Sequence, residues 1–491
     1  MHLGIVVATL LVFGAVTYAL PSFDRFRPWV PAEDGTPLAR LFEQYGELPA
    51  FAGAGGAYAA PSRVSQRTRE QLGEAVARNI GSGDAAEMPQ TEMPDGDGDA
   101  SPAIRIDPRE YEGIEQGIDQ PSALSPFFEA LERTARREPG AVTRIAHYGD
   151  SSIATDLITH TVRRRMQRRF GDAGHGFVLI SRGTMPYGHR DVRHRSGDDW
   201  QLKQIVASQD RAGLYGYGGV AFQPRGASAW AQFATDTDSP VGRQVGQFQL
   251  YYRRQPNGGR IRYRVDGGES EDLETRGEHG DAVEVIRVPD GAHELELRAG
   301  GGGPVRLYGV ALERDTPGVV YDSLGLVGAR ARRLLNYDEE HIGRQMALRE
   351  PSLLVLGFGG NEADDPLHRI EAYEEEFVRV IRRMRAGRDD MACLVFGPLD
   401  QARRDEHGRV ETIPSIPQII QAQRTAAQRE GCAFYNTFEA MGGEGAMATW
   451  ARARPRLALS DYRHATPAGY EVIGNMFYKA LLKAFADHLQ R

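Results

Sequence analysis

The 491-residue sequence predicts an α/β protein with a three-layer α/β/α fold around a parallel sheet, interrupted by an inserted antiparallel β-sandwich. Two observations predict this fold. Apolar strands alternate with amphipathic helices before about residue 196 and again after residue 317, which is the pattern of a doubly wound parallel sheet. Between these segments apolar and polar residues alternate with a period of two, which is typical of antiparallel strands with one buried face.

The N-terminal segment, residues 3–20, is apolar apart from Thr17 and Tyr18. At 1.5 Å per residue it spans roughly 27 Å, close to the ~30 Å thickness of a hydrocarbon core. We interpret residues 1–20 as a signal peptide or an N-terminal membrane anchor, with a buried soluble helix as the alternative. Either of the first two interpretations predicts an exported chain, periplasmic or extracellular, with residues 3–20 as a candidate tether to the inner membrane.

Residues 21–105 predict a flexible linker. The stretch 51–61 consists mostly of small residues, and the stretch 81–102 contains six acidic side chains and no basic one. Such segments cannot bury enough apolar surface to fold alone. We therefore place the α/β domain at residues 106–196 and 317–491, and the inserted β-sandwich at residues 197–316.

The first strand of the α/β domain is VTRIAHY, residues 142–148, followed by Gly149, Asp150 and Ser151. The next segment predicts a helix, because apolar residues recur every four positions, at Ile158, Val162, Met166 and Phe170. Ser151 therefore lies at a strand-to-helix turn. The arginines between residues 163 and 169 predict a solvated helix face, with a patch for an acidic polymer or lipid headgroups as the alternative.

The inserted region predicts paired strands. Apolar positions alternate over residues 248–252 and 261–265, and Asn257-Gly258-Gly259 predicts a turn that joins the two runs as a hairpin. After the insert, apolar strands return at residues 352–361, 391–397 and 432–438. The first of these ends in glycines before Asn361, and ligands of parallel sheets bind at such carboxyl ends.

Composition excludes several classes of protein. The net charge of −8 removes the electrostatic attraction to phosphate backbones, so we expect no nucleic-acid partner. Two cysteines, Cys393 and Cys432, are too few for a disulfide scaffold or a Cys-rich zinc site, and whether they pair stays open. The spacing of His175, His189 and His194 fits no metal-binding pattern, so we expect no metal.

The sequence supplies the groups that a hydroxyl nucleophile needs. A serine nucleophile requires a base, a group that orients the base, and donors for the oxyanion. Ser151 follows a buried strand, and Asp461 precedes His464 by three residues. Thr466-Pro467 then caps the final helix and fixes that loop.

Four blocks of residues resemble the SGNH, or GDSL-type, hydrolase superfamily in their order along the chain. They are GDS at 149–151, YDSLGLVGA with Gly328, GFGGNE with Asn361, and DYRHATPAGY with Asp461 and His464. The resemblance implies Ser151 as nucleophile, His464 as base and Asp461 as its orienting acid. It also implies an oxyanion hole from the N–H groups of Ser151 and Gly328 and the side chain of Asn361, with no cofactor. The second block is the loosest match, so Gly325 is an alternative to Gly328.

The layout is similar to that of bacterial envelope esterases of the peptidoglycan O-acetylesterase type, although the third block reads GGNE where many members have Asp after the Asn. This resemblance implies a serine esterase that removes O-acetyl groups from an envelope or extracellular glycan such as peptidoglycan. A lipolytic esterase, an acyltransferase and a non-catalytic glycan-binding envelope protein are the alternatives. Tyr215, Tyr217 and Trp230 of the insert either stack on sugar rings or pack in the sandwich core.

Overall fold

The computed structural model describes residues 104–491 except for residues 115, 183–186, 237–241, 366–369 and 389. The predicted signal peptide or anchor, and all but the last two residues of the predicted linker, lie outside the described residues. Of the helices within the described part, none has both the length and the apolar composition needed to cross a membrane.

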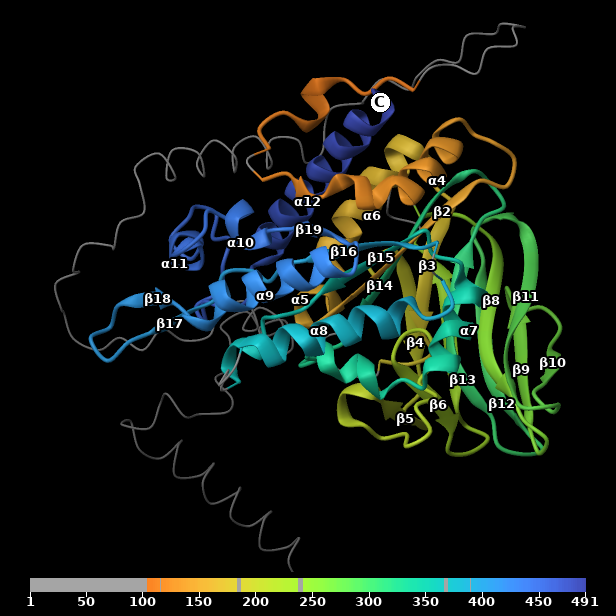
Figure 1. Cartoon of the computed structure of the whole chain (residues 1–491). Helices are drawn as coiled ribbons and strands as arrows, with labels where there is room; N and C mark the ends of the chain where they lie inside the picture. The colour runs from red at the N-terminus through yellow and green to blue at the C-terminus, as the bar shows by residue number, and fades with distance from the viewer. Residues whose placement is uncertain (1–103, 115, 183–186, 237–241, 366–369, 389) are drawn as a thin grey trace, which may run out of the picture. The chain divides into compact units, whose positions relative to one another are not determined.

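A six-stranded sheet forms the centre of the α/β domain, in the order β1-β19-β16-β15-β2-β14 (Figure 1). The strands from β19 to β14 run parallel, and the short β1 pairs antiparallel with β19. The strands are β1 (Ile118–Asp119), β2 (Val142–Gly149), β14 (Gly318–Gly325), β15 (Leu353–Gly357), β16 (Ala392–Phe396) and β19 (Ala433–Tyr435).

Helices cover both faces of this sheet, because successive strand residues point to opposite sides and both sides are apolar. Ile145, Leu353 and Val355 pack in the core that contains α4, α6 and α12, whereas Leu354 and Leu356 pack in the core that contains α7, α8 and α9. The predicted three-layer fold is therefore confirmed. The helices are α4 (Ser125–Ala135), α5 (Ser151–Ala154), α6 (Leu157–Phe170), α7 (Glu339–Arg349), α8 (Ile370–Arg385), α9 (Ser415–Arg429), α10 (Thr437–Ala440), α11 (Ala446–Trp450) and α12 (Pro467–Leu489).

Two antiparallel sheets form the β-rich region between β2 and β14 (Figure 1). One has the order β10-β9-β12-β7-β4 and the other β11-β8-β13-β6-β5, with β3 paired to β13. Their apolar faces share one core. The strands are β3 (Gly174–Leu179), β4 (Val192–Ser196), β5 (Trp200–Gln204), β6 (Val220–Pro224), β7 (Trp230–Thr235), β8 (Val245–Arg254), β9 (Arg260–Val265), β10 (Glu271–Glu274), β11 (Gly280–Gly291), β12 (Glu294–Gly301) and β13 (Arg306–Glu313).

The predicted hairpin of residues 248–265 is wrong. The strands β8 and β9 both form, but β8 pairs with β11 and β13, whereas β9 pairs with β10 and β12. The turn at residues 257–259 therefore carries the chain from one sheet to the other. Both strands bury an apolar face in the shared core, and alternation alone does not tell a hairpin from a crossover between sheets.

The predicted start of the insert, residue 197, is too late. β3 and β4 precede this residue, yet β3 pairs with β13 and β4 pairs with β7 of the antiparallel sheets. All six residues of β3 are buried. Such a strand reads in sequence like one of the parallel sheet, because neither of its faces shows polar alternation.

A buried ion network joins the two parts of the molecule. Arg349 on α7 donates to both carboxylate oxygens of Asp322 on β14, each at 2.8 Å, and pairs with Glu313 on β13. Arg144 on β2 donates to the same Glu313 at 3.0 and 2.8 Å. Arg349, Asp322 and Glu313 are each at most 1% exposed, so these charges lie out of reach of water between the parallel sheet and the β-rich region.

Two further expectations about side chains are corrected. Arg163 does not lie on a solvated face but is fully buried, where it pairs with Asp156 at 2.7 Å and Asp191 at 2.8 Å. Tyr215 and Tyr217 are also fully buried, and the Tyr217 hydroxyl donates to Asp322 at 3.0 Å. They are core residues and cannot stack on a sugar, whereas Trp230 is partly exposed.

The two cysteines form a disulfide between Cys393 on β16 and Cys432 just before β19, with their Cα atoms 4.7 Å apart. The pairing that the sequence left open is thereby decided. The bond joins two neighbouring strands of the parallel sheet at their amino ends.

Candidate active site

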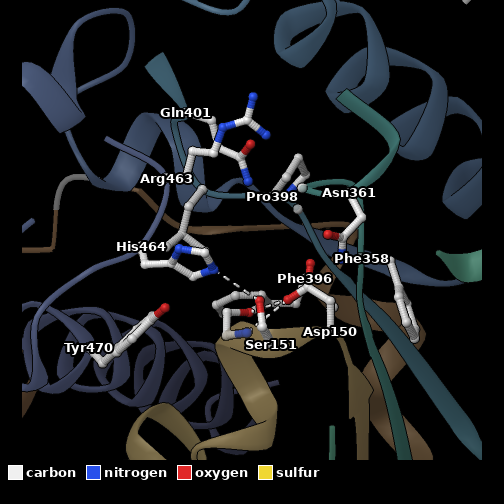
Figure 2. A pocket seen from close by; sticks show the side chains of 15 residues that line it. Asp150, Ser151, Phe358, Asn361, Phe396, Pro398, Gln401, Arg463, His464 and Tyr470 are labelled. Atoms are coloured by element: carbon white, nitrogen blue, oxygen red, sulfur yellow. Dashed lines mark hydrogen bonds between the residues drawn. The ribbon is translucent and has the colours of Figure 1, made fainter. Parts of the chain in front are cut away.

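A small cleft opens at the carboxyl ends of β2, β15 and β16 (Figure 2). The cavity has a volume of about 70 Å³, and Ser151, Asn361 and His464 line it. The remaining lining residues come from the turns after the three strands and from the start of α12: Asp150, Ser152, Gly357, Phe358, Gly360, Phe396, Gly397, Pro398, Leu399, Gln401, Arg463 and Tyr470. The structure therefore brings the predicted nucleophile, base and oxyanion amide together in one cavity.

Ser151, His464 and Asp461 form a continuous hydrogen-bonded chain. The His464 ring donates from Nδ1 to Asp461 Oδ2 at 2.7 Å, so Nε2 is free to accept. The Ser151 hydroxyl donates to that Nε2 at 3.2 Å. Asp461 also accepts the backbone N–H groups of Arg463 at 2.9 Å and His464 at 3.1 Å, which fixes the carboxylate within its loop.

The same contacts set the charge state of the triad. The hydrogen bond that the His464 imidazole donates to Asp461 raises its pKa above the ordinary 6.5, although partial burial opposes this. Partial burial acts to raise the pKa of Asp461, but hydrogen bonds from the ring and the backbone of its own loop hold it at about 2. Asp461 therefore stays ionised and makes His464 a stronger base than a free imidazole, which suits a general base.

Asn361 follows β15 and ties two loops together. Its Nδ2 donates to the carbonyl of Ala329, beside Gly328, at 2.9 Å. A carboxamide has two N–H donors, so the second stays available to an oxyanion. Ser151 is the first residue of α5, and its backbone N–H lacks an intrahelical acceptor.

Gly328 and Gly325 differ in their surroundings. Gly328 has a φ of +73° and is exposed, with no atom within 4 Å of the position that a Cβ would take. Gly325 ends β14, where a Cβ would lie 2.1 Å from the backbone nitrogen of Ala154. The close packing explains why position 325 is a glycine. Neither glycine lines the cleft as described; the oxyanion role of Gly328 stays a prediction.

Glu362 is a site residue that the sequence interpretation passed over. It is 2% exposed, and its carboxyl oxygens accept the N–H groups of Ala331 at 2.7 Å and Gly359 at 3.1 Å. Burial raises the pKa of Glu362 to about 7. It therefore clamps the loops of the second and third blocks, and the GGNE departure from the usual Asp was the only signal for it in the sequence.

Two other polar residues support the loops of the site. Asp150 accepts both the backbone N–H of Ser152 at 2.9 Å and its hydroxyl at 2.8 Å, which caps α5 at Ser151. Arg463 holds both carboxylate oxygens of Asp364, at 2.6 and 2.7 Å, and so links the His464 loop to the segment after Asn361. An acidic residue directly before a short helix was a usable sequence signal for the first, but the second pair is far apart in sequence.

The histidines with no expected metal role lie away from the cleft. His175 and His189 are buried, with ring centroids 6.3 Å apart, and His194 stacks on Phe233. Within the described ranges, no group of three or more His, Cys, Asp or Glu side chains is placed to hold a metal ion.

Comparison with known proteins identifies the fold that carries this site. The model of the GDSL-like lipase/acylhydrolase family matches residues 290–472. A solved structure of a peptidoglycan O-acetylesterase matches with a TM-score of 0.63 and 21% sequence identity, over 75% of this chain and 99% of that chain. The chain has the SGNH hydrolase fold.

Two other matches are more distant. A carbohydrate esterase family 2 enzyme with its carbohydrate-binding domain, from Corynascus thermopiles (Myceliophthora fergusii), gives a TM-score of 0.27 at 11% identity, over 60% of this chain and 99% of that one. The salicylyl-acyltransferase SsfX3 of a tetracycline biosynthetic pathway gives 0.27 at 12% identity, over 61% and 95%. No curated protein sequence matches the chain. In this SGNH hydrolase fold, residues of the first, third and fourth blocks line the cleft at the carboxyl ends of the strands, where ligands of parallel sheets bind.

Proposed function

We propose that this protein is a serine esterase that removes O-acetyl or other small acyl groups from an envelope or extracellular glycan such as peptidoglycan. The observation that carries the proposal is the hydrogen-bonded order Ser151, His464, Asp461 in a cleft that also holds Asn361. An activated serine with an oxyanion donor beside it is the arrangement of acyl transfer through a covalent intermediate.

The reaction follows from the geometry. His464 Nε2 takes the Ser151 proton as Oγ attacks the ester carbonyl, and the carbonyl oxygen becomes an oxyanion beside the free N–H of Asn361 and the N–H of Ser151. The resulting imidazolium is stabilised by Asp461, and it returns the proton to the leaving sugar oxygen. Water, activated by His464 in the same way, then attacks the acyl-enzyme and releases the acid and free Ser151.

The size of the cleft supports a small acyl group. Its volume of about 70 Å³ is small for a ligand site, since sites for drug-sized molecules enclose roughly 300–1,000 Å³. A cleft of this size favours a short acyl group such as acetyl over a long aliphatic chain.

The proposed glycan and compartment are supported by a structural match, by the disulfide and by the sequence of residues 1–20. The peptidoglycan O-acetylesterase structure is matched over nearly its whole length. The disulfide Cys393–Cys432 favours an oxidising compartment, as do the properties of residues 1–20 as a signal peptide or anchor. We therefore place the enzyme outside the cytoplasm, with residues 3–20 as the candidate tether.

A substrate panel tests the proposal. The full-length protein is assayed for kcat/KM on 4-nitrophenyl acetate, butyrate and octanoate, and for acetate release from acetylated peptidoglycan and acetylated xylan. We expect acetate to be the best acyl group and peptidoglycan the best polymer. Faster turnover of octanoate would favour the lipolytic alternative. Transfer of acetyl to an added sugar in preference to water would indicate an acyltransferase, and binding of peptidoglycan without any turnover would indicate a glycan-binding protein.

A further inference from the structure

Gln401 is a polar residue of the cleft that the proposed reaction does not use. It lies between the end of β16 and β17 (Ala402–Arg404), and its backbone is held on both sides. The N–H of Ile413 donates to the Gln401 carbonyl at 2.8 Å, and the N–H of Ala402 donates to the carbonyl of Tyr462, in the His464 loop, at 2.9 Å. The position of Gln401 is therefore fixed relative to the catalytic base.

The side chain of Gln401 extends across Gly360, the residue before Asn361. A Cβ at position 360 would lie 2.6 Å from Gln401 Nε2, which is closer than two such atoms can approach. The carboxamide can lie here only because residue 360 is a glycine. This close approach places the Gln401 amide beside the oxyanion loop and on the wall of the cleft (Figure 2).

The carboxamide of Gln401 has no hydrogen-bond partner among the described residues. Its Oε1 is shut off from solvent and accepts no donor. Turning the amide over would leave an N–H group in the same unsatisfied place, so neither orientation pairs both ends. The Nε2 end, in contrast, is not shut off from solvent and has no hydrogen-bond partner among the described residues, so it is the end of the side chain that a ligand in the cleft can reach.

The chemistry of the site indicates which part of a ligand Gln401 contacts. The leaving sugar oxygen must lie against His464, which returns a proton to it, and Gln401 belongs to the segment hydrogen-bonded to that loop. Phe358 and Phe396 line the same cleft and supply apolar surface. A carboxamide N–H in the wall of this cleft is a donor for an acceptor oxygen of the sugar.

We propose that Gln401 selects sugar esters: its side-chain amide hydrogen-bonds to an acceptor oxygen, a hydroxyl or an acetamido carbonyl, of the sugar that carries the acetyl group. The inference rests on the proposed esterase function. It assigns Gln401 as a specificity-determining residue that contacts the alcohol part of the substrate and takes no part in bond making.

The test is a cycle of enzyme and substrate changes. The full-length wild-type enzyme and Gln401→Met are each assayed on a mono-O-acetylated methyl glucoside and on cyclohexyl acetate, a ring ester without other oxygens. We expect the ratio of the two kcat/KM values, sugar over cyclohexyl, to fall about 5- to 10-fold in Gln401→Met, the loss for one neutral hydrogen bond. The corresponding acetylated N-acetylglucosaminide distinguishes an acetamido contact from a hydroxyl contact. If Gln401 contacts the acetamido carbonyl, the kcat/KM ratio should fall more with this substrate than with the methyl glucoside.

Two variants complete the design. Gln401→Asn keeps the amide but withdraws it by one methylene, so the ratio should fall as well, in a protein that retains the polar group. Gln428→Met, an exposed glutamine on α9, should leave the ratio unchanged. Equal slowing of both substrates by Gln401→Met and Gln401→Asn would overturn the inference while leaving the esterase intact, whereas wild-type enzyme that hydrolyses no ester would overturn the proposed function itself.

Discussion

The catalytic charges and the charges that join the two parts of the molecule differ in their contact with water. The side chains of Asp461 and His464 are each 44% exposed, whereas Arg349 is 1% and Asp322 0% exposed. Burial acts to lower the pKa of Arg349, but its pairs with Asp322 and Glu313 raise it well above its ordinary value, so this guanidinium stays charged at every working pH. The pKa of His464 is raised by its hydrogen bond to Asp461, and its exposure to solvent lets it gain and lose a proton.

This difference indicates that activity depends on the exposed pair of Asp461 and His464, whereas stability depends on the buried network around Arg349. A base that must gain and lose a proton keeps access to solvent, and its partner Asp461 is held by its own loop. Charges that hold two sheets together need fixed protonation and excellent geometry, because each would be costly without its partner. Changes in one network should therefore leave the property governed by the other unchanged.

The largest expected effect comes from removing the nucleophile. Ser151→Ala should lower kcat by at least about 10⁴-fold, since loss of one triad member removes most of the catalysis. Its free energy of unfolding in urea should match the wild-type value, because among the described residues the Ser151 hydroxyl hydrogen-bonds only to His464. A large loss of stability in this variant would break the separation between the two networks.

The next effect concerns the buried network. Arg349→Met should destabilise the fold by about 3–5 kcal/mol, because Asp322 and Glu313 lose their shared cation inside the protein. Urea unfolding measures this, and kcat of the folded fraction should stay near wild type. Arg382→Met is the matched control: that arginine pairs with Glu430 at 65% exposure and should change stability little.

Asn361→Ala should cost about 10²- to 10³-fold in kcat, the usual loss for one oxyanion donor. Steady-state kinetics on 4-nitrophenyl acetate separate kcat from KM. If the change fell on KM alone, Asn361 would bind substrate and not the oxyanion, and the site would need a different donor.

Glu362 shares a property with each network. It is buried like the ion network, yet it belongs to the active-site loops. Its folded pKa of about 7 lies above the ordinary 4.5, so the stability it contributes is present below pH 4.5 and is lost as pH rises through 7. The shift corresponds to roughly 3 kcal/mol. Unfolding of Glu362→Gln, measured from pH 4.5 to 8, should lack this part of the pH dependence; identical slopes in both proteins would contradict the assignment.

The smallest expected effect is a displacement of the pH profile. Neutral His464 is the active form and its pKa is raised by Asp461, so kcat/KM should fall as pH drops through a midpoint above 6.5. In the residual activity of Asp461→Asn that midpoint should move to lower pH, because the hydrogen bond to a carboxylate is lost. A profile that stays flat from pH 5 to 8 would exclude His464 as the base.

The sequence connected Ser151, His464 and Asp461 but did not predict the pairing of strands. The order of the four blocks brought Ser151 and His464 together although 313 residues separate them, and the three side chains do form one hydrogen-bonded chain. The partners of β8 and β9 could not be predicted, since a period of two says which face of a strand is buried but not which sheet covers it.

The burial of individual polar side chains could not be predicted from the sequence either. Arg163 occupies a helical position that the sequence predicts to be solvated, but it is buried and pairs with Asp156 and with Asp191 of a later segment. Tyr217 was open to a role in sugar stacking for the same reason, and the burial of Glu362 was not anticipated. Each of these side chains takes its environment from segments distant in sequence.

The central claim is that His464 activates Ser151 as a covalent nucleophile, and labelling with an aryl phosphonofluoridate, which phosphonylates activated serines, tests it most directly. The account predicts one adduct per chain, located by peptide mass spectrometry on Ser151, with complete loss of esterase activity. The labelling rate should rise with pH through the same midpoint as kcat/KM, and His464→Ala should abolish labelling. Retained activity after complete labelling of Ser151, or an adduct on another residue that alone accounts for the loss of activity, would contradict it.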